Sequence, residues 1–377
     1  MNISKLIELI PKDYEIKKIK SKYKRTSAFV NTARCLALTK NEHAEEFIDN
    51  ALTAVDELHK REINKRPRHY ANCAESYSII GSEKTVFAVD AAVSEIMKRK
   101  QTSDMHNYDE IVISIAHAGV NLNDIKIVDT AKQLCNTIRD TYNTIPSLCS
   151  TAEGYAYFGE TEKALELVGI AKNEISKKQM HEGFLIYLTG IIGDTIIKIG
   201  KINNNLEIIV DAINMIRVPD MHGELNPLRG VRVAVPAINA IKKITGANAP
   251  ETLIDLYKNF EYNSLNNICE MIEDDIPGLY AFDLSLNEAR MLYLIGEKEK
   301  SSEILELMGG YLFGEESGIF YKKNAARVKM ALLWEKMDEE KTTEIINRIY
   351  DEIKDADANE RAVVLSETLS SIQYNST

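Results

Sequence analysis

The chain has 377 residues, of which 45% are hydrophobic and 27% charged, and its 57 acidic and 46 basic residues give a formal net charge of -11. The apolar content excludes an intrinsically disordered chain. Only 18 glycines and 8 prolines exclude a collagen-like or low-complexity chain and favour helices. The length allows two or three globular domains or one extended array of repeats.

The cysteines and the hydrophobic stretches indicate a cytoplasmic protein without membrane contact. The five cysteines are odd in number and lack CxxC spacing, so neither a disulfide framework nor a zinc module is expected. The amino-terminal stretch lacks the apolar core and the small-residue cleavage site of a signal peptide. Residues 183–200 are the most hydrophobic, but Asp194 and Lys198 interrupt them, which predicts a buried helix and no membrane span.

Residues 149–175 carry the clearest helical pattern. Apolar residues recur there at i, i+4, i+7 and i+11 from Ala164, which defines one face of a helix. A second apolar stripe precedes this one, and Gly159 between them indicates a helix stop followed by a polar restart. The segment therefore predicts two antiparallel helices joined at Gly159.

The same hairpin recurs along the chain. Its predicted turn positions are Thr39, Gly81, Asn123, Gly159, Gly200 and Gly296. Seven residues before each turn stands a small residue that lets two helices approach closely: Thr32, Ala74, Ala116, Ala152, Gly193 and Ala289. The spacing through the first five turns is near 42 residues, which is typical of stacked helix pairs. Further turns are expected near Gly246 and Asp338.

These elements predict an all-α, right-handed solenoid of about eight stacked helical hairpins, in a single helical-repeat domain over residues 1–377. Residues 1–25 form a basic lead-in, and residues 217–230 form a loop insertion between repeats. Residues 359–372 form a carboxy-terminal capping helix, whose apolar face consists of Ala362, Leu365, Leu369 and Ile372.

The stretch YAYFGETEKALELVGIA, residues 155–171, resembles a tetratricopeptide unit, with an aromatic at Tyr155, the turn at Gly159 and alanines at Ala164 and Ala171. Residues 74–81 share part of this pattern. The period is similar to that of longer tetratricopeptide variants, such as those of kinesin light chain. The resemblance implies a helical-repeat fold and a protein-binding habit, and it implies no reaction.

In repeats of this kind the first helix of each pair lines a concave groove, and the residue after the small one faces that groove. These positions here are Ala33, Glu75, His117, Glu153, Asp194 and Arg290. Since neighbouring first helices lie about 8 to 10 Å apart, we expect a ladder of separate acidic groups that suits a basic or amide-rich peptide. A solvated polar face is the alternative. Tyr157 and Tyr293 are candidate anchors for the partner, with ordinary packing as their alternative.

Positive charge concentrates near the amino terminus, where residues 1–69 hold 15 basic and 10 acidic residues. The basic residues form two segments, Lys17, Lys18, Lys20, Lys22, Lys24 and Arg25, and then Lys60, Arg61, Lys65, Arg66 and Arg68. If the first hairpin brings the two segments together, they form a positively charged patch that can bind phosphates, an acidic protein or another copy of the chain. Binding of another copy would give a homo-oligomer. A solvated surface is the alternative, and nucleic acid is not favoured because the whole chain is acidic.

The loop at residues 217–230 contains polar residues that a site can use. Asp220 and Glu224 carry hard carboxylate ligands and His222 between them carries an imidazole ligand, so the three can serve as metal ligands. Arg229 can bind an anion. No further ligand that would complete a metal site is recognisable, so a plain connecting loop is the alternative. We expect no metal and no cofactor.

The expected function is that of a non-catalytic scaffold or adaptor, which binds an extended or helical peptide of a protein partner in its groove. One alternative is a ligand-responsive regulatory repeat protein. Another alternative is an enzyme built on an α/α toroid. Two observations count against it: the single tryptophan, Trp334, and a hairpin count nearer eight than six. An open superhelix would favour binding, and a closed ring with a deep central pocket would favour the enzyme.

Overall fold

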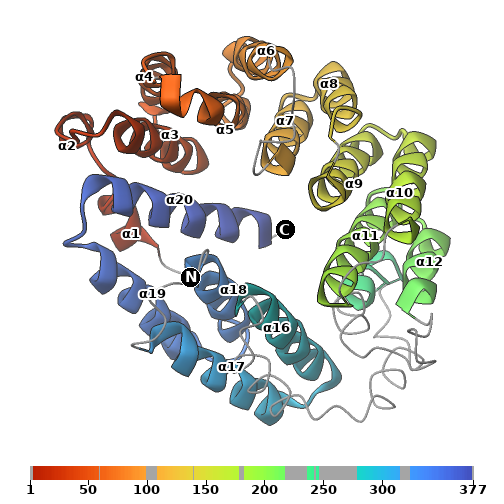
Figure 1. Ribbon diagram of the computed structural model, residues 1–377. Coiled ribbons are helices and arrows are strands. Elements are labelled where there is room, and N and C mark those ends of the chain that lie inside the picture. The colour runs from red at the N-terminus through yellow and green to blue at the C-terminus, as the bar shows by residue number, and fades with distance from the viewer. Residues whose placement is uncertain are drawn as a thin grey trace. The chain divides into compact units, whose positions relative to one another are not determined.

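The computed structural model describes residues 3–58, 60–98, 108–138, 140–177, 182–216, 236–241, 243–245, 278–314 and 323–375 (Figure 1). Within these ranges every element is a helix and no strand occurs, so the prediction of an all-α fold is confirmed there. The chain divides into two compact units, of which unit 1 is Met1–Gly154 with Trp334–Thr377, and unit 2 is Tyr155–Leu333. The loop at 217–230 and the expected turn near Gly246 lie outside the described residues.

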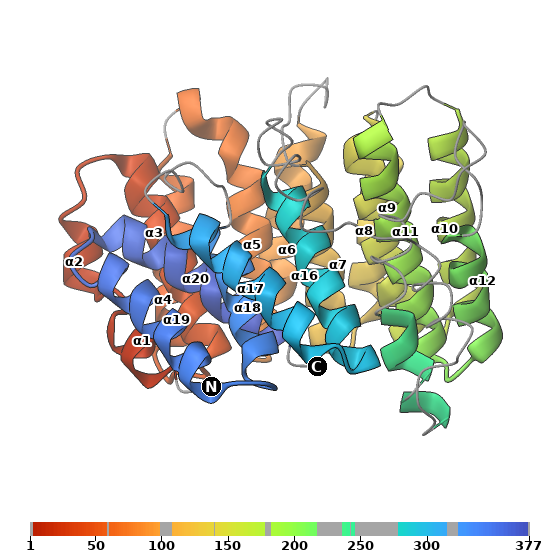
Figure 2. The same ribbon diagram turned by 90° about the horizontal axis from the view of Figure 1, so that it is seen from below.

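Unit 1 is built from pairs of consecutive helices. Its helices are α1 (Ser4–Glu8), α2 (Asp13–Lys17), α3 (Lys22–Leu38), α4 (Ala44–Asp56), the 3-10 helix η1 (Lys60–Lys65), α5 (Arg66–Ile79), α6 (Lys84–Met97), α7 (Tyr108–Leu122), α8 (Ile125–Cys135), most of α9 (Thr141–Tyr157), α19 (Glu339–Ile353) and α20 (Ala358–Asn375). The pairs α3 with α4, α5 with α6, and α7 with α8 pack as hairpins (Figure 2). The first helix of each pair also packs on the next, α3 on α5 and α5 on α7.

Unit 2 follows the same principle. It contains α10 (Thr161–Ser176), α11 (Glu182–Ile202), α12 (Leu206–Ile216), α16 (Gly278–Ile295), α17 (Lys298–Phe313) and α18 (Lys323–Trp334). Helix α11 packs on α10 and α12, and α16 packs on α17. The hydrophobic stretch within α11 is buried, with Leu188 and Ile192 at 0% exposure. Among the described helices, none has the length and apolar character needed to cross a membrane.

Helix α20 packs along α3, far from it in sequence (Figure 1). The Cys35 Sγ atom of α3 lies 3.9 Å from the Ala362 carbonyl oxygen of α20, and Arg361 pairs with Glu15 of α2. Ala362 and Leu365 are fully buried. The helix expected to cap the carboxy-terminal end of the array therefore covers its first long helix, a contact that stacking of sequence neighbours does not predict.

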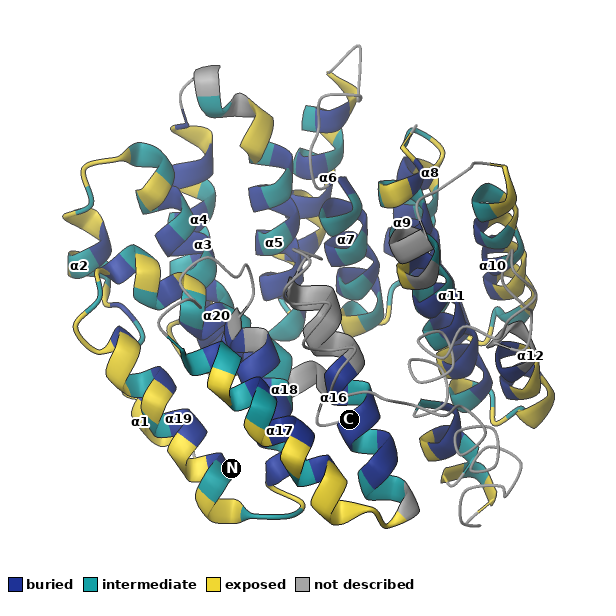
Figure 3. Cartoon of the chain, turned by 60° about the horizontal axis from the view of Figure 1, so that its bottom comes forward, coloured by how far each residue is buried: buried dark blue, intermediate teal, exposed yellow. Residues whose placement is uncertain are grey.

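Helix α19 shows how burial follows the sequence pattern in unit 1. Its isoleucines Ile345, Ile346, Ile349 and Ile353 are buried along one side, while charged residues occupy the exposed side (Figure 3). Asp338 begins the helix, because its side chain accepts hydrogen bonds from the amides of Glu340 and Lys341.

The first helices of six pairs end in one shared geometry. A residue with left-handed backbone follows each helix: Lys40 (φ 53°), Gly81 (72°), Asn123 (56°), Gly159 (77°), Asn204 (53°) and Gly296 (95°). In all six, the amide of the next residue donates to the carbonyl four residues before the left-handed one, at 2.8 to 3.0 Å. This is the Schellman motif, which satisfies carbonyls that the helix end leaves free.

Four predicted turn positions, at Gly81, Asn123, Gly159 and Gly296, are confirmed as left-handed residues. Thr39 is displaced by one residue from Lys40. The prediction at Gly200 is wrong, because Gly200 lies inside α11. A Cβ atom on Gly200 would lie 2.6 Å from Cγ1 of Ile209, so this glycine permits the close packing of α11 on α12.

The predicted small residues do lie where helices approach closely. Five of them are at most 1% exposed, namely Thr32, Ala74, Ala116, Ala152 and Ala289. In unit 2 the hydroxyl of Ser301 on α17 donates to the carbonyl of Ala289 on α16 at 2.7 Å. A larger side chain at Ala289 would separate these two helices.

Candidate functional site

Glu75 on α5 is the centre of a polar cluster in unit 1. Its side chain is 1% exposed. The Oε1 atom accepts a hydrogen bond from Arg34 of α3 at 3.0 Å and lies 3.1 Å from Nδ1 of His117 on α7. The Oε2 atom accepts a hydrogen bond from Ser114 of α7 at 3.0 Å. The cluster therefore joins three consecutive first helices.

This arrangement corrects the expected ladder of separate acidic groups at Glu75. A buried carboxylate is unfavourable by several kcal/mol unless it is paired and hydrogen-bonded, and Arg34 supplies the pairing here. The negative charge of Glu75 is thus neutralised inside the fold and does not face a groove. Sequence reasoning was right that Glu75 and His117 are neighbours in successive hairpins, but it missed Arg34.

The contacts of Glu75 described above involve none of the other residues of the predicted row. Ala33 is buried, whereas Glu153 on α9, Asp194 on α11 and Arg290 on α16 are half-buried. Asp194 and Arg290 belong to unit 2. Of the row, the structure brings Glu75 and His117 together, and a role in partner binding stays a prediction.

The two predicted tyrosine anchors differ in exposure. Tyr157 is 51% exposed and packs edge-on against Phe158, with ring centroids 5.4 Å apart. Tyr293 is half-buried, and the ammonium of Lys298 lies 5.9 Å from its ring. Tyr157 is therefore the more accessible of the two.

The two basic segments meet at the beginnings of α3 and α5, where the rings of Tyr23 and His69 are 6.1 Å apart. Several of their charged side chains already pair with acidic residues of the same chain. Arg25 pairs with Glu57 at 3.7 Å, and Arg68 pairs with Glu110 at 2.5 Å. The patch available to an anion is correspondingly smaller than the sequence indicates.

Other members of the basic segments also have partners. Lys17 pairs with Asp13 at 2.6 Å, Lys18 lies 5.2 Å from the Tyr14 ring, and Arg66 donates to the Asp56 and Leu58 carbonyls. The side chains of Lys60 and Arg61 lie outside the described residues. Lys20, Lys22, Lys24 and Lys65 make none of these side-chain contacts with the described residues. Anion binding by these four stays a prediction.

His69 lies between the two basic segments and does not add to their charge. The side chain is 7% exposed, and neither ring nitrogen has a hydrogen-bond partner among the described residues. Burial, together with the positive charges of Arg68 and Lys65, lowers the pKa of His69 to about 4. The imidazole is therefore neutral at physiological pH.

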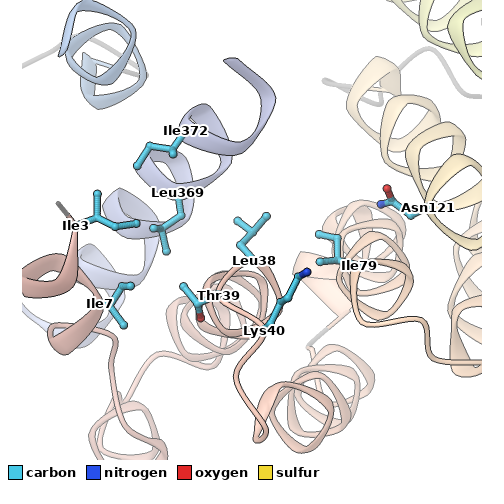
Figure 4. Close-up of a pocket in the computed structure, with 9 residues that line it drawn as sticks. All are labelled: Ile3, Ile7, Leu38, Thr39, Lys40, Ile79, Asn121, Leu369 and Ile372. Atoms are coloured by element: carbon cyan, nitrogen blue, oxygen red, sulfur yellow. The ribbon is translucent and has the colours of Figure 1, made fainter. Parts of the chain in front are cut away.

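Sequence reasoning missed an apolar trough in unit 1 with a volume of about 450 Å³ (Figure 4). We call it the apolar trough, and its lining residues are Ile3, Ile7, Leu38, Thr39, Lys40, Ile79, Asn121, Leu369 and Ile372. The residues of α1 and α20 form one side, those of α5 and α7 form the other, and the end of α3 lies between them (Figure 4). Helices from both ends of the described chain thus build one site.

Most of the trough lining is aliphatic and open to water. Six of the nine residues are isoleucine or leucine. Ile7 is 36% exposed, and Ile3, Leu38, Ile79 and Ile372 are half-buried. The exposed aliphatic side chains make the apolar trough a candidate interaction site.

The polar groups of the apolar trough differ in how far they are satisfied. The Thr39 hydroxyl donates to the Cys35 carbonyl at 2.9 Å, and the Asn121 amide donates to the Ser78 hydroxyl at 3.1 Å. Lys40 is exposed and makes no ion pair with any residue of the described chain. Lys40 is the one charged residue of this lining.

The sequence does contain a signal for part of this site. Leu38, Ile79 and Asn121 each stand two residues before a left-handed helix-end residue. The same position in other hairpins carries Tyr157, Ile202 and Leu294, of which the first two are 51% and 46% exposed. Of the three trough residues, Ile79 alone is an apolar residue two positions before a helix-ending glycine or asparagine, so the local signal marks this part of the trough. The contribution of α1 and α20 has no such local signal.

Cysteine and metal chemistry is limited in the part of the chain that the structure describes. No group of three or more potential ligands is found there. The described cysteines, Cys35, Cys73, Cys135 and Cys149, are buried thiols outside any disulfide. Burial raises the pKa of Cys35 to about 12 and that of Cys135 to about 11, so these thiols are poor nucleophiles. The ligand candidates Asp220, His222, Glu224 and Arg229 lie outside the described residues.

Comparison with known proteins assigns no family. No family model matches the sequence, and no curated protein matches it. Among solved structures, the chain is similar to Ton1535 from Thermococcus onnurineus NA1, with 14% identity over 85% of this chain and 95% of that chain and a TM-score of 0.33. A likeness of this extent leaves both family and function unassigned.

Proposed function

We propose that this chain is a non-catalytic interaction protein, a scaffold or adaptor that binds a peptide or helical segment of a protein partner. The observation that carries the proposal is the apolar trough, in which five of six aliphatic side chains are at least partly open to water, beside a lysine that has no ion pair with the described residues. Exposed aliphatic surface is unfavourable in a free protein and is covered when a partner binds.

The helical pairs support the proposal. A tetratricopeptide-like solenoid of about eight hairpins is the architecture we propose, and the six shared helix ends agree with its regular spacing. Such an array places equivalent residues of successive hairpins along one edge. In unit 1 this edge contributes Leu38, Ile79 and Asn121 to the apolar trough.

A ligand-responsive regulatory protein is a second candidate, favoured by the origin of the trough walls. Ile7 comes from α1 and Leu369 from α20, which are distant in sequence. A molecule bound between them would bridge these two helices and stabilise their packing in unit 1. The bound state would then differ from the free state in the stability of unit 1.

Affinity capture from native cell extract tests the proposed function. The full chain is compared with Ile7→Asp, which places a charge in the apolar trough, and with Val86→Asp as the matched control. Val86 is 45% exposed on α6 and lies outside the trough lining. We expect one protein to be captured by the wild type and by Val86→Asp, and to be lost with Ile7→Asp.

Two results would reject this function. Equal capture by all three forms would remove the apolar trough as the binding site. Absence of any specific protein with the wild type, at low and at high salt, would remove the scaffold function itself and favour a small-molecule ligand.

A further inference from the structure

We propose that the apolar trough binds an amphipathic α-helix of a protein partner, whose aliphatic side chains pack on the six trough aliphatics and whose carboxylate pairs with Lys40. The inference rests on the proposed function and names the class of partner segment.

The charge of Lys40 indicates an acidic residue in the partner. Lys84, which also follows a hairpin turn, pairs with Asp49 at 2.8 Å and with Glu45 at 3.3 Å. Lys40 has no such partner in the described chain, and it is exposed in a trough lining that is mostly aliphatic. An ammonium beside apolar surface favours a ligand that brings its own carboxylate.

The left-handed backbone conformation at Lys40 indicates that the lysine side chain has a function. Lys40 has a φ of 53°, in the left-handed region, where the equivalent residues of five other hairpins are glycine or asparagine. Side chains other than those of asparagine and aspartate rarely adopt this conformation, because Cβ crowds the following carbonyl. The chain keeps a lysine at a position where glycine would fit with less strain. Backbone strain of this kind is found at functional positions.

The hydrogen bonds at the end of α3, where Thr39 and Lys40 line the floor of the trough, favour a helical ligand over an extended peptide. The amides of Thr39, Lys40 and Asn41 all donate to carbonyls of α3, at 3.1, 3.0 and 2.9 Å. The trough floor therefore has no free amide there to pair with an added strand. A helix satisfies its own backbone and needs only side-chain contacts.

The exposure of the lining favours a helix over an alkyl chain. Ile7 is 36% exposed, and four other aliphatic residues of the trough are half-buried. An alkyl chain lying on such an open surface would keep much of its own surface in water. A helix covers the apolar trough with one face and presents its polar face to solvent.

The predicted partner thus has the opposite charge to the basic peptide that the sequence alone suggests. That expectation depended on unpaired acids such as Glu75, and Arg34 neutralises Glu75 inside the fold. In the lining of the apolar trough, the charge without a counter-charge among the described residues is the positive charge of Lys40.

The test uses the full chain and a display library of random peptides of about sixteen residues, roughly four helical turns. Enriched peptides are synthesised, and their dissociation constants are measured by fluorescence anisotropy. Dodecanoate is titrated in parallel as an alkyl carboxylate. The variants are Lys40→Glu, Lys40→Gly and Ile7→Asp, with Lys126→Glu as a matched control, since Lys126 is an exposed lysine of unit 1 outside the trough lining.

We expect enriched peptides to carry aliphatic residues at i, i+3 or i+4, and i+7, with an acidic residue beside them. Lys40→Glu should weaken their binding by about tenfold or more, and replacing the peptide's acid by lysine should restore it. Lys40→Gly should weaken binding without lowering the thermal midpoint, which separates lost recognition from unfolding. Lys126→Glu should bind as the wild type does.

Three outcomes would overturn the inference. Peptides that are basic or lack the helical spacing, or that bind Lys40→Glu and Ile7→Asp as tightly as the wild type, would reject the trough helix and leave a protein-binding function standing. Binding of dodecanoate with no enriched peptide would reject both the helix and the protein-binding function. Binding of neither probe would reject both as well.

Discussion

The Nδ1 atom of His117 lies 3.1 Å from the Oε1 atom of Glu75, although 42 residues separate the two in sequence. Arg34, 41 residues before Glu75, donates to the same oxygen at 3.0 Å. Each of these separations is about the length of one helix pair. Equivalent positions of three successive first helices therefore come into direct contact. The cluster is therefore expected to stabilise unit 1.

Glu75→Ala is expected to lower the free energy of unfolding by about 3 kcal/mol, because it removes the buried carboxylate to which Arg34 and Ser114 donate. Glu75→Gln should lose less, since an amide keeps part of the hydrogen bonding. Urea unfolding followed by circular dichroism measures the change. Asp90→Ala on α6, an exposed acid, is the control and should be neutral. Equal stability of Glu75→Ala and Asp90→Ala would show that the cluster contributes nothing.

The helix-end residues Lys40 and Gly81 occupy equivalent positions and should respond in opposite directions. Lys40→Gly removes a strained left-handed side chain and should raise the free energy of unfolding by about 1 kcal/mol. Gly81→Ala should lower it by about 1 kcal/mol. A Cβ on Gly81 would meet nothing within 4 Å, so its effect is that of the backbone alone. Thermal midpoints of both variants decide this, and a change of the same sign in both contradicts it.

Gly119 on α7 is expected to be intolerant of any side chain. A Cβ there would lie 2.8 Å from Cγ2 of Val128 on α8. Gly119→Ala should therefore lower the free energy of unfolding by about 1 to 3 kcal/mol. Gly169→Ala on α10 is the matched control, because a Cβ at Gly169 meets nothing within 4 Å and alanine favours the helix.

A double-variant cycle checks the cause of the Gly119 effect. Val128→Ala makes room for the added methyl group, so Gly119→Ala with Val128→Ala should cost less than the sum of the two single changes. Additive losses would mean that the close approach of α7 and α8 is not what limits Gly119.

Stability should fall with acid through His69. Its folded pKa of about 4 lies below the value of about 6.5 expected in the unfolded chain, so the unfolded state takes up the proton first as pH falls. The contribution is fully present above about pH 6.5 and is lost between about pH 6.5 and 4, by up to about 3 kcal/mol.

Unfolding free energies measured across that pH range test the prediction with His69→Phe, which cannot titrate and keeps an aromatic ring beside Tyr23. This variant should flatten the profile between about pH 6.5 and 4. His43→Gln, at an exposed position of the same unit, should leave the profile as in the wild type. A wild-type slope retained by His69→Phe would assign the acid sensitivity to other groups.

The helix ends show what local sequence can predict. Glycine and asparagine are recognisable at a helix end because they tolerate left-handed backbone, and Gly81, Asn123, Gly159 and Gly296 were predictable for that reason. Lys40 was not, since lysine carries no such signal. Gly200 was misplaced because a glycine that permits close packing looks the same in sequence as a glycine that ends a helix.

The candidate sites depend on contacts that no local pattern reports. The adjacency of Glu75 and His117 followed from the period, but the pairing of Glu75 with Arg34 depends on how α3 and α5 approach. The apolar trough requires α20 to lie beside α3. Periodicity predicts which face of α20 is buried, but it does not predict which helix covers that face.

The packing of α20 on α3 has a consequence for synthesis of the chain. The contact between Cys35 and Ala362 spans 327 positions, so α3 emerges from the ribosome on the order of tens of seconds before the helix that covers it. During that interval the face of α3 that buries Cys35 has no cover, and unit 2 is made in between. Non-local contacts of this kind slow folding and prolong the exposure of apolar surface. Nascent chains of this protein should therefore need chaperone protection until α20 has been released.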